Sequence, residues 1–155
     1  MLSWQFEQLL RKDLVVQPEA LRILTRALTH VMVRPAGRPG PAGMFLLLGP
    51  VGSGKNELIR AVARVLGEDP LRVPRLNAGL FLQAPPFLNF LHQLSQERAR
   101  APRPRASRSP ELVVVENVES ASSPVLDVLV HIFELGNIAV ASGVHLDFTG
   151  VLFVF

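Results

Sequence analysis

The fold of this chain is decided by the stretch Gly49-Pro50-Val51-Gly52-Ser53-Gly54-Lys55-Asn56. It follows the apolar run 44–48, an expected strand, and precedes residues 57–66, an expected helix. A strand, a glycine-rich turn and a helix in this order form the setting of a P-loop, whose backbone amides surround phosphate oxygens. Lys55 is placed to reach the β and γ phosphates, and the helix adds the positive end of its dipole. The sequence therefore predicts a phosphate-binding turn.

Asn56 is the one departure from the P-loop pattern. That position normally holds Ser or Thr, whose hydroxyl binds magnesium. The asparagine changes this magnesium ligand while the glycines and Lys55 before it stay intact. We therefore expect phosphate binding next to an altered metal site.

A second altered position follows the apolar run 112–115, which is typical of a buried parallel strand. P-loop enzymes carry an acid at the end of such a strand to hold magnesium, and ATPases add a second acid that polarises the attacking water. Here the two positions hold Glu116 and Asn117. Glu116 can hold magnesium through water, whereas Asn117 can orient a water but cannot accept its proton. A plain strand end with polar caps is the alternative interpretation.

Strands and helices alternate along the chain, which predicts βαβ units, a parallel sheet and an α/β fold. The expected strands cover 44–48, 71–76, 112–115 and 151–155. The expected helices cover 4–14, 18–33, the residues from the P-loop to Gly67, 85–99 and 122–133. We divide the chain into N-terminal helices (1–34), a Pro/Gly loop (35–43) and a nucleotide-binding core (44–155), which includes an arginine-rich loop at 98–110.

Composition limits the remaining function classes. The 155 residues suit one domain, and with no cysteine the chain has no disulfide or thiolate site. Residues 98–108 hold five arginines and no acid, so the net charge of +3 comes from this segment and the rest is net negative. A solvated loop explains it best, a polyanion or partner contact is the alternative, and nucleic-acid binding is unlikely. The sequence shows neither a signal peptide nor a transmembrane segment.

Other candidate residues give weaker signals. The four histidines have no metal-ligand spacing and fit ordinary satisfied or exposed side chains. They are His30, His92, His131 and His145. The segment 103–107 resembles a site for a basophilic kinase at Ser107, a match that is common by chance.

Together these features resemble the AAA+ superfamily, and within it the Clp-type unfoldases and their torsin branch. Residues 10–20 are similar to the short helix, "GQ-x-x-A" element and long helix that precede the family's P-loop. The pair Lys55-Asn56 is similar to torsins, which carry Asn where other AAA+ proteins carry Thr or Ser. Residues 76–85 resemble the torsin segment after the second strand, and the resemblance covers about residues 8–155.

The resemblance implies a three-layer AAA+ sandwich that binds ATP with Mg²⁺, with the P-loop residues 49–56 holding the phosphates and Glu116 in the magnesium position. Asn117 falls where torsins keep a catalytic Glu, and a neutral residue there typically lets AAA+ proteins bind ATP without hydrolysing it. The chain ends at Phe155, so the family's sensor Asn, fifth strand and helical lid are expected to be missing. Torsins act in the lumen of the endoplasmic reticulum and nuclear envelope and are activated by partner proteins.

Three functional interpretations follow. The favoured one is a torsin- or Clp-like, chaperone-related ATP-binding protein that hydrolyses ATP poorly or not at all without a protein partner or a second copy of itself. The second is an interaction or scaffold module that kept the fold and lost nucleotide binding. The third is an active unfoldase subunit that obtains its lid from elsewhere. The intact Lys55 favours the first interpretation, and the altered Asn56 and Glu116 favour the second.

Overall fold

The structure is a computed structural model that describes residues 8, 18–35, 37–100 and 109–155. In chain order its elements are α2 (Pro18–Met32), β1 (Gly43–Phe45), α3 (Lys55–Leu66), β2 (Arg75–Asn77), η1 (Ala78–Leu80), α4 (Ala84–Arg100), β3 (Glu111–Glu116), η2 (Val118–Ser120), α5 (Ser123–Leu135), β4 (Asn137–Ala139), β5 (His145–Asp147) and β6 (Val151–Val154). The helix expected at 4–14 lies outside the described residues apart from Gln8, and so do residues 101–108 of the arginine-rich segment.

Four strands form one parallel sheet in the order β1-β6-β3-β2. The chain leaves β1 through the P-loop and reaches β2, at the other end of this order, before β3 and β6 fill the space between them. Hydrogen bonds from Phe155 N–H to Phe45 O (2.8 Å) and from Leu47 N–H to Phe155 O (2.7 Å) extend the pairing of β1 and β6. The predicted four-stranded parallel sheet is confirmed, although β1 covers 43–45 rather than the expected 44–48, and Leu46 and Leu48 beyond it are exposed.

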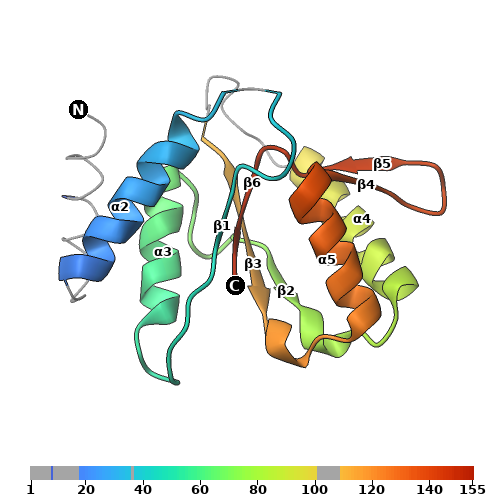
Figure 1. The fold of residues 1–155 in the computed structure, drawn as a ribbon, viewed down its shortest axis with the longest axis horizontal. Coiled ribbons are helices and arrows are strands. Elements are labelled where there is room, and N and C mark those ends of the chain that lie inside the picture. The colour runs from blue at the N-terminus through green and yellow to red at the C-terminus, as the bar shows by residue number, and fades with distance from the viewer. Residues whose placement is uncertain (1–7, 9–17, 36, 101–108) are drawn as a thin grey trace.

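Helices cover both faces of the sheet and make three layers (Figure 1). Alternate residues of β3 point to opposite faces because side chains alternate along a strand. Leu112 and Val114 join the core beneath α2 and α3, whereas Val113 and Val115 join the core beneath α4 and α5. Burial of both faces explains why the middle strands read as unbroken apolar runs.

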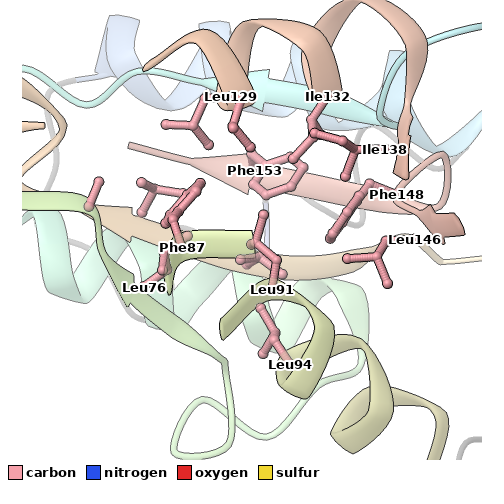
Figure 2. Packing of buried hydrophobic residues seen from close by; sticks show 14 of the residues in the cluster. Leu76, Phe87, Leu91, Leu94, Leu129, Ile132, Ile138, Leu146, Phe148 and Phe153 are labelled. Carbon is pink, nitrogen blue, oxygen red and sulfur yellow. The ribbon is translucent and has the colours of Figure 1, made fainter. Parts of the chain in front are cut away.

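The core beneath α4 and α5 is the larger of the two and is rich in phenylalanine (Figure 2). Phe153 of β6 lies at its centre, with its ring 5.7 Å from Phe133 of α5 and 5.9 Å from Phe148. Phe87 of α4, also fully buried, closes the core on the opposite side. These contacts fix α4 and α5 against the sheet.

The second strand differs from the prediction, since it covers 75–77 rather than 71–76. The Asp69 carboxylate accepts from Leu71 N–H (3.0 Å), and the Asp69 carbonyl accepts from Arg72 N–H (2.9 Å). These bonds hold residues 69–72 in a turn, so Leu71 is 89% exposed and the strand starts later. The predicted turn at Asp69 is correct.

The arginine-rich segment is also not a loop from its start, because Arg98 and Arg100 belong to the last turn of α4. Arg98 is held there by an ion pair with Glu111, the first residue of β3, and its guanidinium lies 5.6 Å from the centre of the Phe148 ring. The predicted loop at 98–110 was therefore wrong for residues 98–100. The predicted helices at 18–33, 85–99 and 122–133 are confirmed within one or two residues at each end.

A hairpin of β4 and β5 was not predicted. Its strands are antiparallel, with Ile138 opposite Leu146, and Gly143 in the connecting turn has a φ of 76°. Gly136 joins α5 to this hairpin with a φ of 75°, and an added Cβ would lie 2.9 Å from the backbone of Gly40. A glycine is therefore required at this junction on both grounds.

Candidate functional site

The predicted P-loop lies between β1 and α3, at the edge of the sheet where the parallel strands end (Figure 1). Gly52 and Gly54 have φ values of 83° and 87°, a backbone conformation that residues other than glycine rarely adopt. A Cβ on Gly49 would lie 2.7 Å from the Ser53 Oγ. The positive φ values therefore require glycine at 52 and 54, whereas a side chain at 49 would have to displace the Ser53 hydroxyl, and the loop exposes its tip at Val51.

Lys55 is the first residue of α3. Its ammonium group donates to the carbonyl oxygens of Gly49 and of Pro50, the latter at 3.0 Å. Ser53 N–H also donates to Pro50 O, at 3.2 Å. The Lys55 ammonium and the Ser53 N–H therefore both donate to backbone carbonyls of the loop. A phosphate would accept stronger, charge-assisted hydrogen bonds from the ammonium than these neutral carbonyls do.

The start of α3 supplies further donors. The first hydrogen bond of the helix runs from Leu58 N–H to Gly54 O (3.0 Å), so the N–H groups of residues 55–57 have no partner within the helix. They point toward the loop side, where the helix dipole favours an anion. Residues 49–55 thus bring the Lys55 ammonium and the first N–H groups of α3 to the same loop, where the helix dipole favours an anion.

Glu116 lies at the end of β3, on the α3 side of the sheet, and is brought next to Asn56 by one arginine. Arg75 of β2 donates through one guanidinium nitrogen to Glu116 Oε1 at 2.5 Å and to Asn56 Oδ1 at 3.3 Å. The side chains of Arg75 and Glu116 are 36% and 40% exposed, so this pair faces solvent next to the P-loop. The structure thus brings the expected magnesium ligand Glu116 next to Asn56, which occupies the altered magnesium position, but with a cation between them.

The contact with Arg75 determines whether the residues present suit Mg²⁺. Asn56 and Glu116 both offer oxygen atoms, which are the ligands that Mg²⁺ prefers. The guanidinium uses one oxygen from each of these side chains, and its positive charge repels a divalent ion placed beside it. As arranged, the oxygen atoms of Asn56 and Glu116 do not suit the metal.

Asn117 is the only described residue other than glycine with a positive φ (54°). Its carbonyl accepts from Ser120 N–H at 3.1 Å, which starts η2. Gly79 of η1 lies against it, since an added Cβ at Gly79 would be 3.4 Å from the Asn117 Cβ. Asn117 therefore follows Glu116 in the chain but lies where η1 and η2 contact each other. Its side-chain amide is exposed and is too weak a proton acceptor to act as a general base.

Arg75 was not predicted as a site residue. The signal was a single arginine one residue before the buried Leu76, on a strand expected to end beside the P-loop. The alternation of Val73, Arg75 and Asn77 against Leu76 places Arg75 on the face opposite the larger core. Its pairing with Glu116 depends on the alignment of β2 with β3, in which Arg75 lies opposite Val114, and this alignment cannot be read from either strand alone.

The weaker sequence candidates do not form a site. Across the described parts of the chain, no three His, Cys, Asp or Glu side chains gather in a way that could hold a metal ion. The His92 ring contacts Gln96 on the same helix at 3.1 Å. Ser107 and the arginines at 103, 105 and 108 lie outside the described residues. Among the helices that the structure describes, none is both long enough and apolar enough to cross a membrane.

Comparison with known proteins identifies the family of this domain. A family model described as an AAA domain of the Cdc48 subfamily matches residues 40–155. The chain is 26% identical to the chaperone protein ClpB of Wolinella succinogenes over 160 residues, which cover 96% of this chain and 18% of that protein. It is 28% identical to ClpB of Agrobacterium fabrum over 165 residues (99% and 19%), and 28% identical to ClpB 2 of Thermosynechococcus vestitus over 160 residues (97% and 18%). The chain therefore spans less than a fifth of the length of these relatives.

Proposed function

Because this chain belongs to the AAA domain family (Cdc48 subfamily), we propose that it is a Clp-like, chaperone-related module that binds ATP in its P-loop and hydrolyses it poorly or not at all on its own. AAA+ ATPases generally use ATP and Mg²⁺, and the similar ClpB proteins are named as chaperones. The observation that carries the proposal is the cradle around Lys55, in which glycines with positive φ and the start of α3 face the same point.

Each part of the cradle has a role in this proposal. The N–H groups at the start of α3 and the Lys55 ammonium bind phosphate oxygens, and the glycines allow the backbone to approach them closely. When phosphates enter, Lys55 exchanges the carbonyls of Gly49 and Pro50 for an anion. This exchange favours binding because hydrogen bonds between charged groups are roughly twice as strong as neutral ones.

Equilibrium binding of the fluorescent analogue N-methylanthraniloyl-ATP tests the proposal. We expect binding by the wild type and a loss of more than about tenfold in Lys55→Ala, since a charge-assisted bond contributes about 1.5–3 kcal/mol. Arg60→Ala is the matched control, because Arg60 is a cation on the same helix that pairs only with Glu57 among the interactions seen there. If neither the wild type nor Lys55→Ala binds the analogue while circular dichroism shows that both are folded, ATP binding is rejected.

Weak hydrolysis rests on Asn117. A P-loop ATPase needs a carboxylate that polarises the attacking water, and an amide cannot take the proton. We expect phosphate release from ATP by the wild type to equal that of Lys55→Ala in a single-turnover assay with protein in excess. Release that is faster in the wild type than in Lys55→Ala would contradict this part of the proposal and leave ATP binding intact.

The torsin branch, the partner and the compartment are finer proposals. The torsin assignment is supported by Asn56 after Lys55, and it would bring with it a luminal location and activation by a partner protein. A homo-oligomer in which a neighbouring copy supplies activating groups is the other possibility for partnership. Sedimentation velocity with and without ATP separates these two, because a homo-oligomer sediments as a larger species without any added partner.

The second candidate function is an interaction module without nucleotide. It is favoured by apolar side chains that α5 leaves in solvent, since Leu126, Val130 and Leu135 are 38%, 51% and 46% exposed. Arg75 also satisfies Asn56 and Glu116 without any ligand. The binding experiment above decides between the two candidates.

A further inference from the structure

A guanidinium lies between Glu116, the expected magnesium ligand, and Asn56, which replaces the usual Ser or Thr ligand. Arg75 contacts Glu116 Oε1 at 2.5 Å and Asn56 Oδ1 at 3.3 Å through the same nitrogen. These contacts join residues far apart in the chain, one from the start of α3, one from β2 and one from the end of β3. The position of Arg75 is thus set by the sheet and not by a flexible loop.

The local charges explain what the guanidinium can do there. Arg75 neutralises the Glu116 carboxylate, which would otherwise repel a triphosphate next to the P-loop. A guanidinium has five N–H donors, and its contacts with Asn56 and Glu116 use one of its three nitrogens. The other N–H groups can bind phosphate oxygens in the forked geometry that arginine favours.

We propose that Arg75 is the built-in cation of this nucleotide site, so that the chain binds a nucleoside triphosphate without magnesium. Glu116 is then a positioning residue that holds Arg75, and not a metal ligand. Asn56 fits the same role, because an amide oxygen accepts from a guanidinium where the usual Ser or Thr would bind the metal. The proposal rests on the proposed ATP binding and adds its cation requirement.

Binding of N-methylanthraniloyl-ATP in excess EDTA and in excess magnesium chloride tests this inference. We expect the wild-type Kd to differ by less than about threefold between the two conditions, a difference well below the tenfold step of 1.4 kcal/mol. Arg75→Ala should weaken binding in EDTA by about ten- to a hundredfold, the loss of a charge-assisted bond, and magnesium should restore part of it. Arg75→Lys should keep a part of the EDTA binding because it keeps the charge without the fork.

Two further variants make the result specific. Arg72→Ala removes a nearby arginine whose side chain is 82% exposed and pairs with Asp69, and it should change nothing in either condition. Glu116→Gln removes the carboxylate that holds Arg75 in place, so binding should weaken to the same extent in EDTA and in magnesium, and by less than in Arg75→Ala. If Glu116→Gln instead weakens binding only in magnesium, Glu116 is a metal ligand and the proposal is wrong.

The remaining outcomes separate this inference from the proposed function. If the wild type binds only with magnesium and Lys55→Ala abolishes that binding, the cradle is real and Arg75 does not replace the metal. If Arg75→Ala binds as the wild type does in EDTA, Arg75 has no part in the site. Absence of binding in both conditions overturns the ATP proposal and this inference together. Thermal unfolding followed by circular dichroism ensures that each variant is folded before its Kd is interpreted.

Discussion

Each end of β3 carries a glutamate that pairs with an arginine, but one pair is buried and the other is half-exposed. At its first residue, Glu111 pairs with Arg98, and these side chains are 8% and 13% exposed. At its last residue, Glu116 pairs with Arg75, and these are 40% and 36% exposed. One strand therefore offers a comparison of a buried and a half-exposed ion pair of identical chemistry.

Their surroundings show what the difference means. At the first end, Arg98 lies over the Phe148 ring, and β3 is further held by Glu111 N–H on Gly150 O (2.8 Å) and Leu112 N–H on the Glu68 carboxylate (3.1 Å). At the last end, the P-loop lies beside the pair and short 3-10 turns follow the strands. The buried pair thus joins α4 to the sheet, whereas the half-exposed pair leaves other N–H groups of Arg75 accessible to a ligand.

Breaking the buried pair should give the largest effect. Arg98→Ala removes a buried cation that pairs with the Glu111 carboxylate, and we expect the free energy of unfolding to fall by about 3–5 kcal/mol. Arg75→Ala is the matched control at the other end and should cost about 1 kcal/mol or less. Urea denaturation followed by circular dichroism measures both. Equal losses would mean that burial does not separate the two pairs.

Ligand binding should stabilise the last end of β3 and leave the first end unaffected. At about 100 times its Kd, ATP should raise the free energy of unfolding by about 2.7 kcal/mol, because it binds only the folded chain. Lys55→Ala should abolish the increase, while Glu68→Gln, a change at the first end, should keep it. The measurement is urea denaturation with and without ATP. An increase that survives Lys55→Ala would place the ligand outside the P-loop.

Asn117 tests the backbone at the last end of β3. With φ at 54° and ψ at 41°, it is in the left-handed region, where asparagine is tolerated better than other residues that carry a Cβ. Asn117→Ala should therefore cost about 1 kcal/mol, and Asn117→Gly should stay within about 0.5 kcal/mol of the wild type. Asn89→Ala, on the exposed side of α4, is the control and should be neutral or slightly stabilising. Thermal unfolding of the three variants measures the effect, and an Asn117→Ala variant as stable as the wild type would refute the backbone argument.

The AAA+ sandwich could be predicted because its signals are local. The glycines of the P-loop, the apolar run 112–115 and the helix end at Gly67 each follow from neighbouring residues, and the structure confirms all three elements. The hairpin had a signal too, since Ile138 and Val140 alternate before Gly143 and Leu146 and Phe148 alternate after it. That signal was missed because the strands are three residues long and follow a helix directly.

The arginine contacts could not be predicted in the same way. The pairing of Arg75 with Glu116 depends on how β2 aligns with β3, and that of Arg98 with Glu111 depends on α4 returning to the start of β3. In the sequence, Arg98 belongs to a basic run that reads as a solvated loop, and only its burial against Phe148 distinguishes it. Residues can thus be assigned to elements locally, but ion pairs between elements depend on the assembled sheet.

The smallest expected effect tests whether the Arg75–Glu116 pair is open to ligands. Glu116→Gln should lower the free energy of unfolding by less than about 1 kcal/mol at low salt, since half-exposed ion pairs contribute little. The loss should shrink toward zero near 1 M sodium chloride, where the screening length falls to about 3 Å. Glu119→Gln, which changes an exposed acid on η2, controls for the change in net charge.

The loss in Arg98→Ala should persist at high salt, because the buried pair is shielded from ions. A salt-independent loss above about 2 kcal/mol in Glu116→Gln would make its pair structural like that of Glu111, and would contradict the view that the Arg75–Glu116 pair is open to ions and ligands.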